Sequence, residues 1–295
     1  MVKKKIGLVT VLFNSDDVLE GFFRSLSIQK FQDFSLYIID NSPSESSTLL
    51  LSELAEKYSI KSLFHVKNSK NNGIAAGNNQ GIKMSLSDGT DYTLLLNNDI
   101  EFDQPYLLEA IYRKAVEEQQ AFVVPKILYY GTKVIWMAGG YISKYKAATF
   151  HRGDGKLDND EYNKESSYRY SPTCFMLINN SIFKSVGLMD ESYFVYYDDT
   201  DFLYRANKEG YLVRYVPSLV VYHKVSMSTG GMNSPFSVYY MTRNKLKFIN
   251  KHYKGATKAI ANLIALAVSF KCLLIFQRKN KYALIRGVKD ALTGR

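Results

Sequence analysis

The chain has 295 residues with a net charge of +10, and 46% of the residues are hydrophobic. This length allows one large α/β domain or two small ones with a sizeable core. From Arg243 onward there are 13 lysines and arginines against one acid, Asp290, so the preceding residues are close to neutral. A near-neutral body with a basic, apolar tail favours a membrane surface as partner, and we expect no nucleic-acid binding.

The two cysteines, Cys174 and Cys272, lie far apart in sequence. This is neither a disulfide framework nor a metal-binding spacing, and it fits a reducing compartment. The apolar run at 6–13 is too short for a secretory signal and leads straight into Asn14 without a small-residue cleavage site. We therefore expect this run to be a buried first strand and the protein to be cytoplasmic.

The N-terminal part alternates between apolar runs typical of strands and amphipathic segments typical of helices. Strands are expected at 5–13, 34–40, 62–66 and within 92–99, and helices at 16–29, 46–58, after the glycine-rich loop that begins at 71, and at 104–118. This alternation predicts parallel βαβ units and a doubly wound sheet.

The alternation breaks after about residue 120. The segment 120–185 indicates shorter, partly antiparallel strands, and 153–166 is polar enough for a mobile loop. A helix and a strand are expected within 198–223, and a separate tail begins near 236.

Three of the expected strands end in polar side chains, namely Asn14, the pair Asp40 and Asn41, and the triplet Asn97, Asn98 and Asp99. Ligands of open α/β sheets bind outside the carboxyl ends of the strands. A crevice of carboxylates and amides suits a ligand with a base, a ribose and phosphates held through a metal. An equally good interpretation of Asp40 and Asn41 is that they cap the following helix.

The stretch NNGIAAGNNQGI, 71–82, has glycines at 73, 77 and 81. Such spacing allows the backbone to approach a ligand closely at the start of a helix. It is neither a dinucleotide-binding fingerprint nor a P-loop. The alternative is a glycine-rich turn with close helix packing.

Asp99 is the best candidate for a metal ligand, because Mg²⁺ and Mn²⁺ prefer oxygen donors and are often held by few carboxylates plus phosphates. Asp198, Asp199 and Asp201 crowd one helix start, where a single acid suffices for capping. The crowding indicates a metal, a cationic partner such as Arg205, or a general base with a perturbed pKa. His223 follows a strand, where a lone histidine is more often structural.

Together these motifs resemble the family 2 glycosyltransferases, of GT-A fold, and most closely their bacterial rhamnosyltransferase-like and galactofuranosyltransferase-like members. The resemblance covers about residues 5–250. It is carried by TVLFNS at 10–15, IIDNSPS at 38–44, NNGIAAGNNQGI at 71–82, LLLNNDI at 94–100, VGLMDESYFVYYDDTDFLYRANKEGY at 186–211, YHKVSMS at 222–228 and YYMTRNKLKF at 239–248.

The resemblance implies a role for each matching position. Asp199 is expected to be the catalytic base, and Asp99 and His223 the metal ligands, with Mg²⁺ or Mn²⁺ as cofactor. The residues expected around the nucleotide sugar are Thr10, Asn14, Asp40, Asn41, Asn71, Gly73, Gly77, Asn78, Asn97 and Asn98. Those expected at the acceptor or in support are Asp198, Asp201, Arg205 and Trp136.

Two positions depart from the family pattern. Asn97 stands where the metal-binding Asp-x-Asp element has its first aspartate, and Asp198 stands where a glutamate usually precedes the catalytic aspartate. The retained Asp99 keeps the metal-binding end of that element. The shorter Asp198 keeps the charge but changes its reach.

The function that the resemblance implies is inverting, single-displacement transfer of rhamnose, galactofuranose or a similar sugar from a dTDP- or UDP-linked donor. The acceptor is expected to be a glycan or lipid-linked glycan in bacterial cell-surface polysaccharide synthesis. Asp199 would take the proton of the acceptor hydroxyl, and the metal would stabilise the leaving diphosphate. The alternatives are a nucleotidyltransferase and an inactive nucleotide-sugar or glycan-binding module, which Asn97 supports best.

The expected architecture is a GT-A domain at 1–235 and a helical, basic C-terminal region at 236–295. The domain would combine a Rossmann-like, mostly parallel nucleotide-binding half, 1–120, with a smaller mixed acceptor half, 121–235. In the tail, the apolar stretch 256–276 contains Lys258, Asn262 and Lys271, which disfavour a spanning helix.

With Lys258, Asn262 and Ser269 on one face of that helix, Ile260, Leu263, Ile264, Val268 and Phe270 remain for a hydrophobic surface. We expect an interfacial helix on anionic lipid that places the protein at the inner face of the cell membrane. Packing on the protein's own domain or in a homodimer is the alternative.

Overall fold

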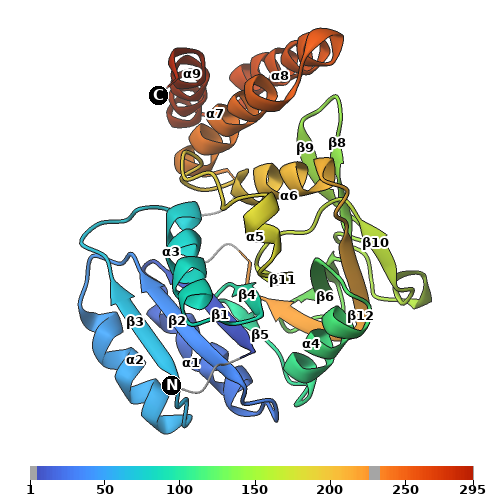
Figure 1. The fold of residues 1–295 in the computed structure, drawn as a ribbon. Helices are drawn as coiled ribbons and strands as arrows, with labels where there is room; N and C mark the ends of the chain where they lie inside the picture. Colours follow the sequence, from blue (N-terminus) through green and yellow to red (C-terminus); the bar gives the residue numbers. More distant parts are fainter. Residues whose placement is uncertain (1–4, 226–232, 295) are drawn as a thin grey trace.

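The computed structural model describes residues 5–225 and 233–294 and has an α/β core with a helical C-terminal region (Figure 1). Within these residues, a ten-stranded sheet with the path β10-β12-β6-β11-β4-β1-β2-β3 runs through the core. Strand β5 pairs with β12, and β7 with β6, outside that path. The mostly parallel α/β arrangement with a helical tail is the one expected.

The N-terminal half forms the parallel part of the sheet. Its elements are β1 (Ile6–Leu12), α1 (Asp16–Ser27), β2 (Phe34–Asp40), α2 (Ser46–Lys57), β3 (Leu63–Lys67), α3 (Ile74–Ser87) and β4 (Tyr92–Leu96). Strand β1 pairs in parallel with β2 and with β4, and β2 with β3. Every residue of β2 and β4 is buried, as expected for strands covered on both faces. The predicted strands and helices of this half are confirmed, the buried first strand included.

The second half is mixed. Its elements are β5 (Ile100–Glu101), α4 (Leu107–Glu117), β6 (Phe122–Tyr129), β7 (Ile135–Met137), β8 (Gly140–Ser143), β9 (Ala148–His151), β10 (Ser166–Tyr168), β11 (Phe175–Asn179), α5 (Ile182–Ser185), α6 (Asp198–Lys208) and β12 (Val213–His223). Strand β11 runs antiparallel to both β4 and β6 and so joins the two halves. The prediction of short, partly antiparallel strands is confirmed.

The polar segment 153–166 is better anchored than the prediction of a mobile loop implied. It contains a 3₁₀ turn at Asp160–Tyr162. The Nζ atom of Lys126, a buried residue of β6, lies 2.8 and 2.9 Å from the carboxylate oxygens of Asp158 and also donates to Asn163. A buried ammonium needs such partners, and this requirement fixes the loop against the sheet.

Two glycines let α3 lie directly on β1. A Cβ atom on Gly77 would come within 2.8 Å of the Val11 side chain, and one on Gly81 within 2.3 Å of Val9. Both distances are shorter than carbon atoms tolerate. For these two glycines the helix-packing alternative therefore accounts for the spacing.

The C-terminal region consists of α7 (Pro235–His252), α8 (Gly255–Ile275) and α9 (Arg278–Thr293) and lies beyond α6 at one end of the molecule (Figure 1). Phe248 and Tyr253 of this region form a hydrophobic cluster with Tyr193 and Tyr197, from the loop before α6. The C-terminal helices are thus packed against the segment that carries Asp198 and Asp199.

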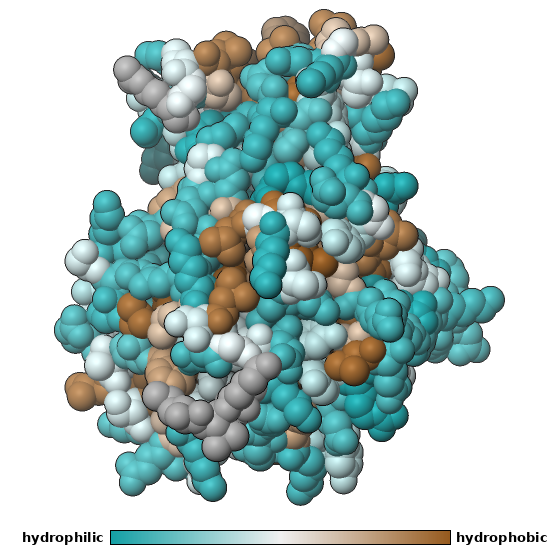
Figure 2. Space-filling model, in the orientation of Figure 1, coloured by the Kyte–Doolittle hydropathy of each residue, from teal (hydrophilic) through white to brown (hydrophobic). Residues whose placement is uncertain are grey.

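Helix α8 is long and apolar enough to cross a membrane, and 11% of its most apolar window is buried. Its polar residues Lys258, Asn262 and Ser269 are half-buried, as is Ile264, which we had expected on the outer face. The exposed apolar side chains are Ile260, Leu263, Leu266, Val268, Phe270, Leu274 and Ile275. Hydrophobic residues are visible on the C-terminal helices at the top of Figure 2.

Candidate active site

The ends of β4 and β12 bring Asp99 and His223 together. Strand β5 pairs antiparallel with β12, so that His223 lies opposite Ile100, and the backbone N of Lys224 donates to the Asp99 carbonyl. The Asp99 Oδ1 atom lies 3.2 Å from His223 Nε2, and both side chains are largely buried. The two residues predicted as metal ligands are therefore neighbours. Residues 226–228 of the YHKVSMS motif lie outside the described residues.

The Asp99–His223 pair has unused ligand capacity. Among the residues that the structure describes, His223 Nδ1 has no hydrogen-bond partner, and Asp99 Oδ1 has none beyond its 3.2 Å contact with His223 Nε2. In the same part of the chain no group of three histidine, cysteine or acidic side chains forms a metal site. Two protein ligands are enough for a divalent cation whose other ligands are phosphate oxygens and water. The donor set therefore fits Mg²⁺ or Mn²⁺ bound together with a diphosphate.

An aromatic wall runs from this pair toward Asp199. The ring centroid of Trp136 lies 4.4 Å from that of His223 and 4.7 Å from that of His151. His151 in turn lies against Tyr170, 5.9 Å between centroids, and Tyr170 Oη donates a hydrogen bond of 2.7 Å to Asp199. The predicted metal ligands and the predicted base are thus connected through the side chains of Trp136, His151 and Tyr170.

The charges of Asp99 and Asp199 both act on the buried thiol of Cys174. Burial, and then the negative charges of Asp99 and Asp199, raise its pKa well above the ordinary value. The backbone N of Asn97 donates to the carbonyl of Cys174, which fixes the end of β4 at this point.

The backbone before α6 is held in an unusual conformation. Tyr196 and Tyr197 have φ angles of 61° and 67°, in the left-handed region that bulky side chains rarely adopt. The Nδ2 atom of Asn244 in α7 donates to the carbonyls of Val195 and Tyr196, at 2.7 and 2.9 Å, and Tyr197 Oη donates to Ala147. Such strain persists only where surrounding contacts over-determine it. Here those contacts set where Asp198 and Asp199 begin α6.

Asp198 and Asp199 share a low-dielectric site. Burial raises the pKa of both carboxyls, and repulsion from Asp199 raises that of Asp198 further. Asp199 accepts hydrogen bonds from Tyr170 Oη and from the backbone N of Thr200, and these lower its pKa in part. We infer that the shared negative charge resides on Asp199, which makes it the stronger candidate for a base.

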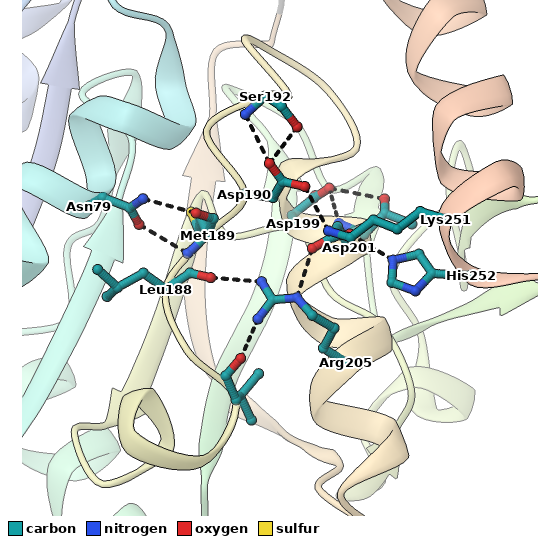
Figure 3. Close-up of polar contacts among 12 residues, drawn as sticks. Asn79, Leu188, Met189, Asp190, Ser192, Asp199, Asp201, Arg205, Lys251 and His252 are labelled. Carbon is teal, nitrogen blue, oxygen red and sulfur yellow. Dashed lines mark hydrogen bonds and ion pairs between the residues drawn. The ribbon is translucent and has the colours of Figure 1, made fainter. Parts of the chain in front are cut away.

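Asp201 does not face this site. Its carboxylate is fully buried and accepts from Arg205 Nε at 2.8 Å, Lys251 Nζ at 2.7 Å and His252 Nε2 at 2.7 Å (Figure 3). Although burial alone raises the pKa of Asp201, these three partners lower it below the ordinary value. Lys251 also pairs with Asp190 at 2.6 Å. Asp201 therefore ties α6 to α7.

Arg205 extends this network into the loop that follows α5. Its guanidinium donates to the carbonyls of Val186 and Leu188, and Asn79 of α3 exchanges hydrogen bonds with the backbone of Met189 (Figure 3). Arg205 thus supports the site rather than lining it. The same loop connects α3, on the N-terminal half, with α6.

Asp40, expected around the nucleotide sugar, is fully buried at the end of β2. Its oxygens accept from the backbone N of Ser42 at 2.8 Å, Ser47 Oγ at 2.5 Å and Lys67 Nζ at 2.9 Å. Burial raises the pKa of Asp40, but these hydrogen bonds lower it further than burial raises it. Helix α2 has Glu45 at its N-cap and no side-chain capping bond, so the capping interpretation of Asp40 is wrong, and contact of Asp40 with the nucleotide base stays a prediction.

Hydrogen bonds connect the residues around the start of α3. Asn41 Nδ2 donates to the carbonyl of Gly73, Asn41 Oδ1 accepts from Asn68, and Asn71 Oδ1 accepts from the backbone N of Gly73. The φ angle of Gly73 is +84°, and a Cβ there would lie 2.3 Å from the carbonyl oxygen of Phe194. Only glycine fits at this approach between α3 and the loop before α6.

The remaining residues predicted near the nucleotide lie in or after β1, after β4 and in α3. Thr10 is fully buried, and its Oγ1 has no partner among the described residues. Asn14 is exposed with a φ angle of 49°, and buried Asn98 donates to Ser15 Oγ. Asn78 is buried beside the sulfur of Met189.

Several supporting residues escape analysis of the sequence alone. Tyr170 belongs to none of the quoted motifs, and Asn244 lies inside YYMTRNKLKF, 239–248, where no role was expected for it; each acts across a long sequence separation. Asn79 lies inside the glycine-rich stretch 71–82, but the sequence does not indicate its partner. Lys251 was visible only as part of the basic tail.

Comparison with known proteins assigns the family. Residues 8–187 match the family described as Glycosyl transferase family 2. The chain belongs to this family. It is therefore a glycosyltransferase, as the motifs indicated.

Relatives of similar length extend the likeness beyond the matched domain. The chain is 24% identical over 286 residues to the low-salt glycan biosynthesis hexosyltransferase Agl10 of Haloferax volcanii, over 94% of this chain and 87% of that protein. It is 22% identical over 291 residues to the dTDP-rhamnosyl transferase RfbF of Shigella flexneri, over 95% and 91%.

The solved structure of the mannosyltransferase PcManGT from Pyrobaculum calidifontis, in complex with GDP-Man and Mn²⁺, superposes with a TM-score of 0.58. The sequence identity is 12%, and the match covers 100% of this chain and 75% of that chain. This likeness confirms the expected GT-A fold.

The Asp201 cluster should make a large contribution to stability. Asp201→Asn leaves Arg205, Lys251 and His252 without their shared anion, and we expect a loss of about 3–5 kcal/mol in the free energy of unfolding. Chemical denaturation at pH 7 measures it. Glu161→Gln, which breaks an exposed pair with Arg152, should cost less than about 1 kcal/mol.

The pH dependence of this loss has a defined sign. Because the pKa of Asp201 is lowered on folding, its contribution is present above the unfolded-state pKa of about 4 and disappears as pH falls through the folded-state pKa. The difference between the variant and the wild type should therefore shrink in acid. Equal unfolding energies for Asp201→Asn and the wild type at pH 7 would refute the role of the cluster.

Proposed function

We propose that the protein is an inverting glycosyltransferase that moves rhamnose, galactofuranose or a similar sugar from a UDP- or dTDP-linked donor to a glycan or lipid-linked glycan. The observation that carries this proposal is the placement of Asp199 on the same aromatic wall as the Asp99–His223 pair. A base and a diphosphate site that face one space are what single displacement at an anomeric carbon requires.

Each step follows from the residues of the site. The charged Asp199 accepts the proton of the acceptor hydroxyl as the hydroxyl oxygen attacks the anomeric carbon and displaces the nucleoside diphosphate. The hydrogen bond from Tyr170 keeps the Asp199 carboxylate ionised and oriented. Buried aromatic side chains exclude water from the reacting centre. A divalent cation held by Asp99 and His223 would supply charge stabilisation for the diphosphate.

The relatives support parts of this proposal. The name of RfbF gives a dTDP-rhamnosyl transferase, and the PcManGT structure holds a GDP-sugar with Mn²⁺. Membership in family 2 disfavours the nucleotidyltransferase alternative. The substitution of Asn97 still favours the inactive-module alternative, whereas the joint presence of Asp99, Asp199 and His223 in one site favours catalysis.

A donor panel tests the reaction directly. We expect release of one nucleoside diphosphate from UDP-, dTDP- or GDP-linked sugars in the presence of Mn²⁺ or Mg²⁺, and its loss with EDTA. Asp199→Asn should lower kcat by about 10²- to 10⁴-fold, the usual value of a general base. Asp154→Asn, at an exposed loop acid, is the control and should leave kcat within about twofold. Full activity of Asp199→Asn would exclude the proposed base.

The pH profile should report the environment of Asp199. Its activity requires the ionised form, so kcat/KM falls as pH decreases through a pKa that burial has raised above about 4. Tyr170→Phe removes a hydrogen bond that lowers this pKa, and the acid limb should move up by about one pH unit. Tyr129→Phe, which removes a similar bond to Asp154, should leave the limb in place. If Tyr170→Phe leaves the acid limb in place, that limb does not report the pKa of Asp199.

We further propose that the exposed face of α8 rests on the anionic inner surface of the cell membrane. Leu263 and Phe270 are 67% and 65% exposed, and they lie two turns apart on one helix. The basic residues Lys254 and Arg278 flank the helix. An apolar face with cations at its borders is the pattern of interfacial helices.

Binding to vesicles tests this placement. Leu263→Glu/Phe270→Glu should lower the partition coefficient onto phosphatidylglycerol vesicles by about tenfold or more, since each side chain loses over 1 kcal/mol of transfer energy. Leu49→Glu/Leu157→Glu alters two equally exposed side chains elsewhere and serves as control. If both double variants sediment with vesicles like the wild type, α8 does not dock on lipid.

A further inference from the structure

A groove of about 790 Å³ lies between the first turns of α7 and the first half of α9. We call it the α7/α9 groove. Its aromatic residues are Phe236, Tyr239, Tyr240 and Tyr282, and its cationic residues are Arg278, Lys279 and Arg286. None of these residues belongs to the candidate active site. The groove thus combines apolar walls with positive charge.

The cations of the groove are largely uncompensated. Arg286 lies 5.0 Å above the Tyr239 ring and 3.6 Å from Asp290, whose carboxylate also accepts from Tyr239 Oη. Arg278 and Lys279 form no ion pair with any residue that the structure describes. Three cations less one carboxylate leave a net charge of +2. The groove therefore suits an anion with about two negative charges.

One end of the groove borders apolar surface. Leu274 and Ile275, the last residues of α8, are 69% and 68% exposed. They precede Arg278 by only four and three residues, respectively. These exposed side chains are available to an apolar chain attached to an anion in the groove.

The other end of the groove adjoins the loop that leads to the proposed base. Phe194 stacks on Tyr240, with 5.2 Å between ring centroids, and contacts Phe236 edge-on. The Phe194 carbonyl accepts the backbone N–H of Ile74 at the start of α3. Phe194 thus connects the groove walls to the segment that carries Asp199 five residues later.

We propose that the α7/α9 groove binds the diphosphate headgroup of a lipid-linked sugar acceptor. Arg278, Lys279 and Arg286 bind the headgroup, and the aromatic walls pack against the first units of the chain. A diphosphate that links a sugar to a lipid carries two negative charges, which matches the groove, whereas an ordinary phosphodiester headgroup carries one. This inference rests on the proposed function and names the class of its acceptor.

The test uses the full chain and farnesyl diphosphate as probe, with saturating UDP to fill the nucleotide site. The groove variant Arg278→Gln/Lys279→Gln/Arg286→Gln should bind the probe about tenfold or more weakly, a loss of about 1.4 kcal/mol. The control Lys271→Gln/Lys281→Gln/Lys289→Gln removes the same charge outside the groove and should stay within about twofold. Titration calorimetry measures affinity, and thermal unfolding checks that both variants fold.

Further arms separate the possible sources of binding. Tyr282→Ala, a change at a 71% exposed side chain, should weaken farnesyl diphosphate but leave inorganic diphosphate unchanged. Farnesol should bind more weakly than farnesyl diphosphate. Equal loss in the groove and control variants, equal affinity for inorganic and farnesyl diphosphate, or preference for phosphatidylglycerol would overturn the proposal. UDP binding reports the proposed function separately, because the groove variant should leave it unchanged.

Discussion

A single buried carboxylate, that of Asp201, holds the catalytic half together. An ionised carboxylate without solvent contact is costly unless cations and hydrogen bonds surround it. Arg205, Lys251 and His252 meet that need from two helices. This requirement fixes α6 relative to α7. Arg205 also binds the loop that contacts α3 and so holds that loop against α6.

With α6 fixed in this way, the surrounding contacts can stabilise the strained turn before it. Asn244 and the Tyr197 hydroxyl hold the two left-handed residues, and the chain then enters α6 with Asp198 and Asp199 at its start. Burial raises the pKa of both carboxyls, and because the Tyr170 hydrogen bond partly lowers that of Asp199, we infer that the shared charge lies on Asp199. Asp201 thus stabilises the contact between α6 and α7, whereas Asp199 of the same helix is the proposed base.

Much of the fold followed from the sequence, because local patterns decide it. Buried strands of the N-terminal half appear as apolar runs such as LLL before Asn97, and their polar ends identify the site edge. The role of Asp201 did not follow, because its partners Lys251 and His252 lie 50 and 51 residues away, in a segment whose sequence indicates only a basic tail. The packing role of Gly77 and the anchoring of 153–166 by Lys126 likewise depend on contacts between distant segments.

The central claim is that Asp99 and His223 form, with a divalent cation, the diphosphate site that faces Asp199. Calorimetric titration of UDP in Mn²⁺ and in EDTA tests it most directly, with Asp99→Ala measured beside the wild type. The account predicts that UDP binds about tenfold or more tightly with Mn²⁺, and that Asp99→Ala abolishes this difference. Equal UDP affinity in Mn²⁺ and EDTA for the wild type would contradict it.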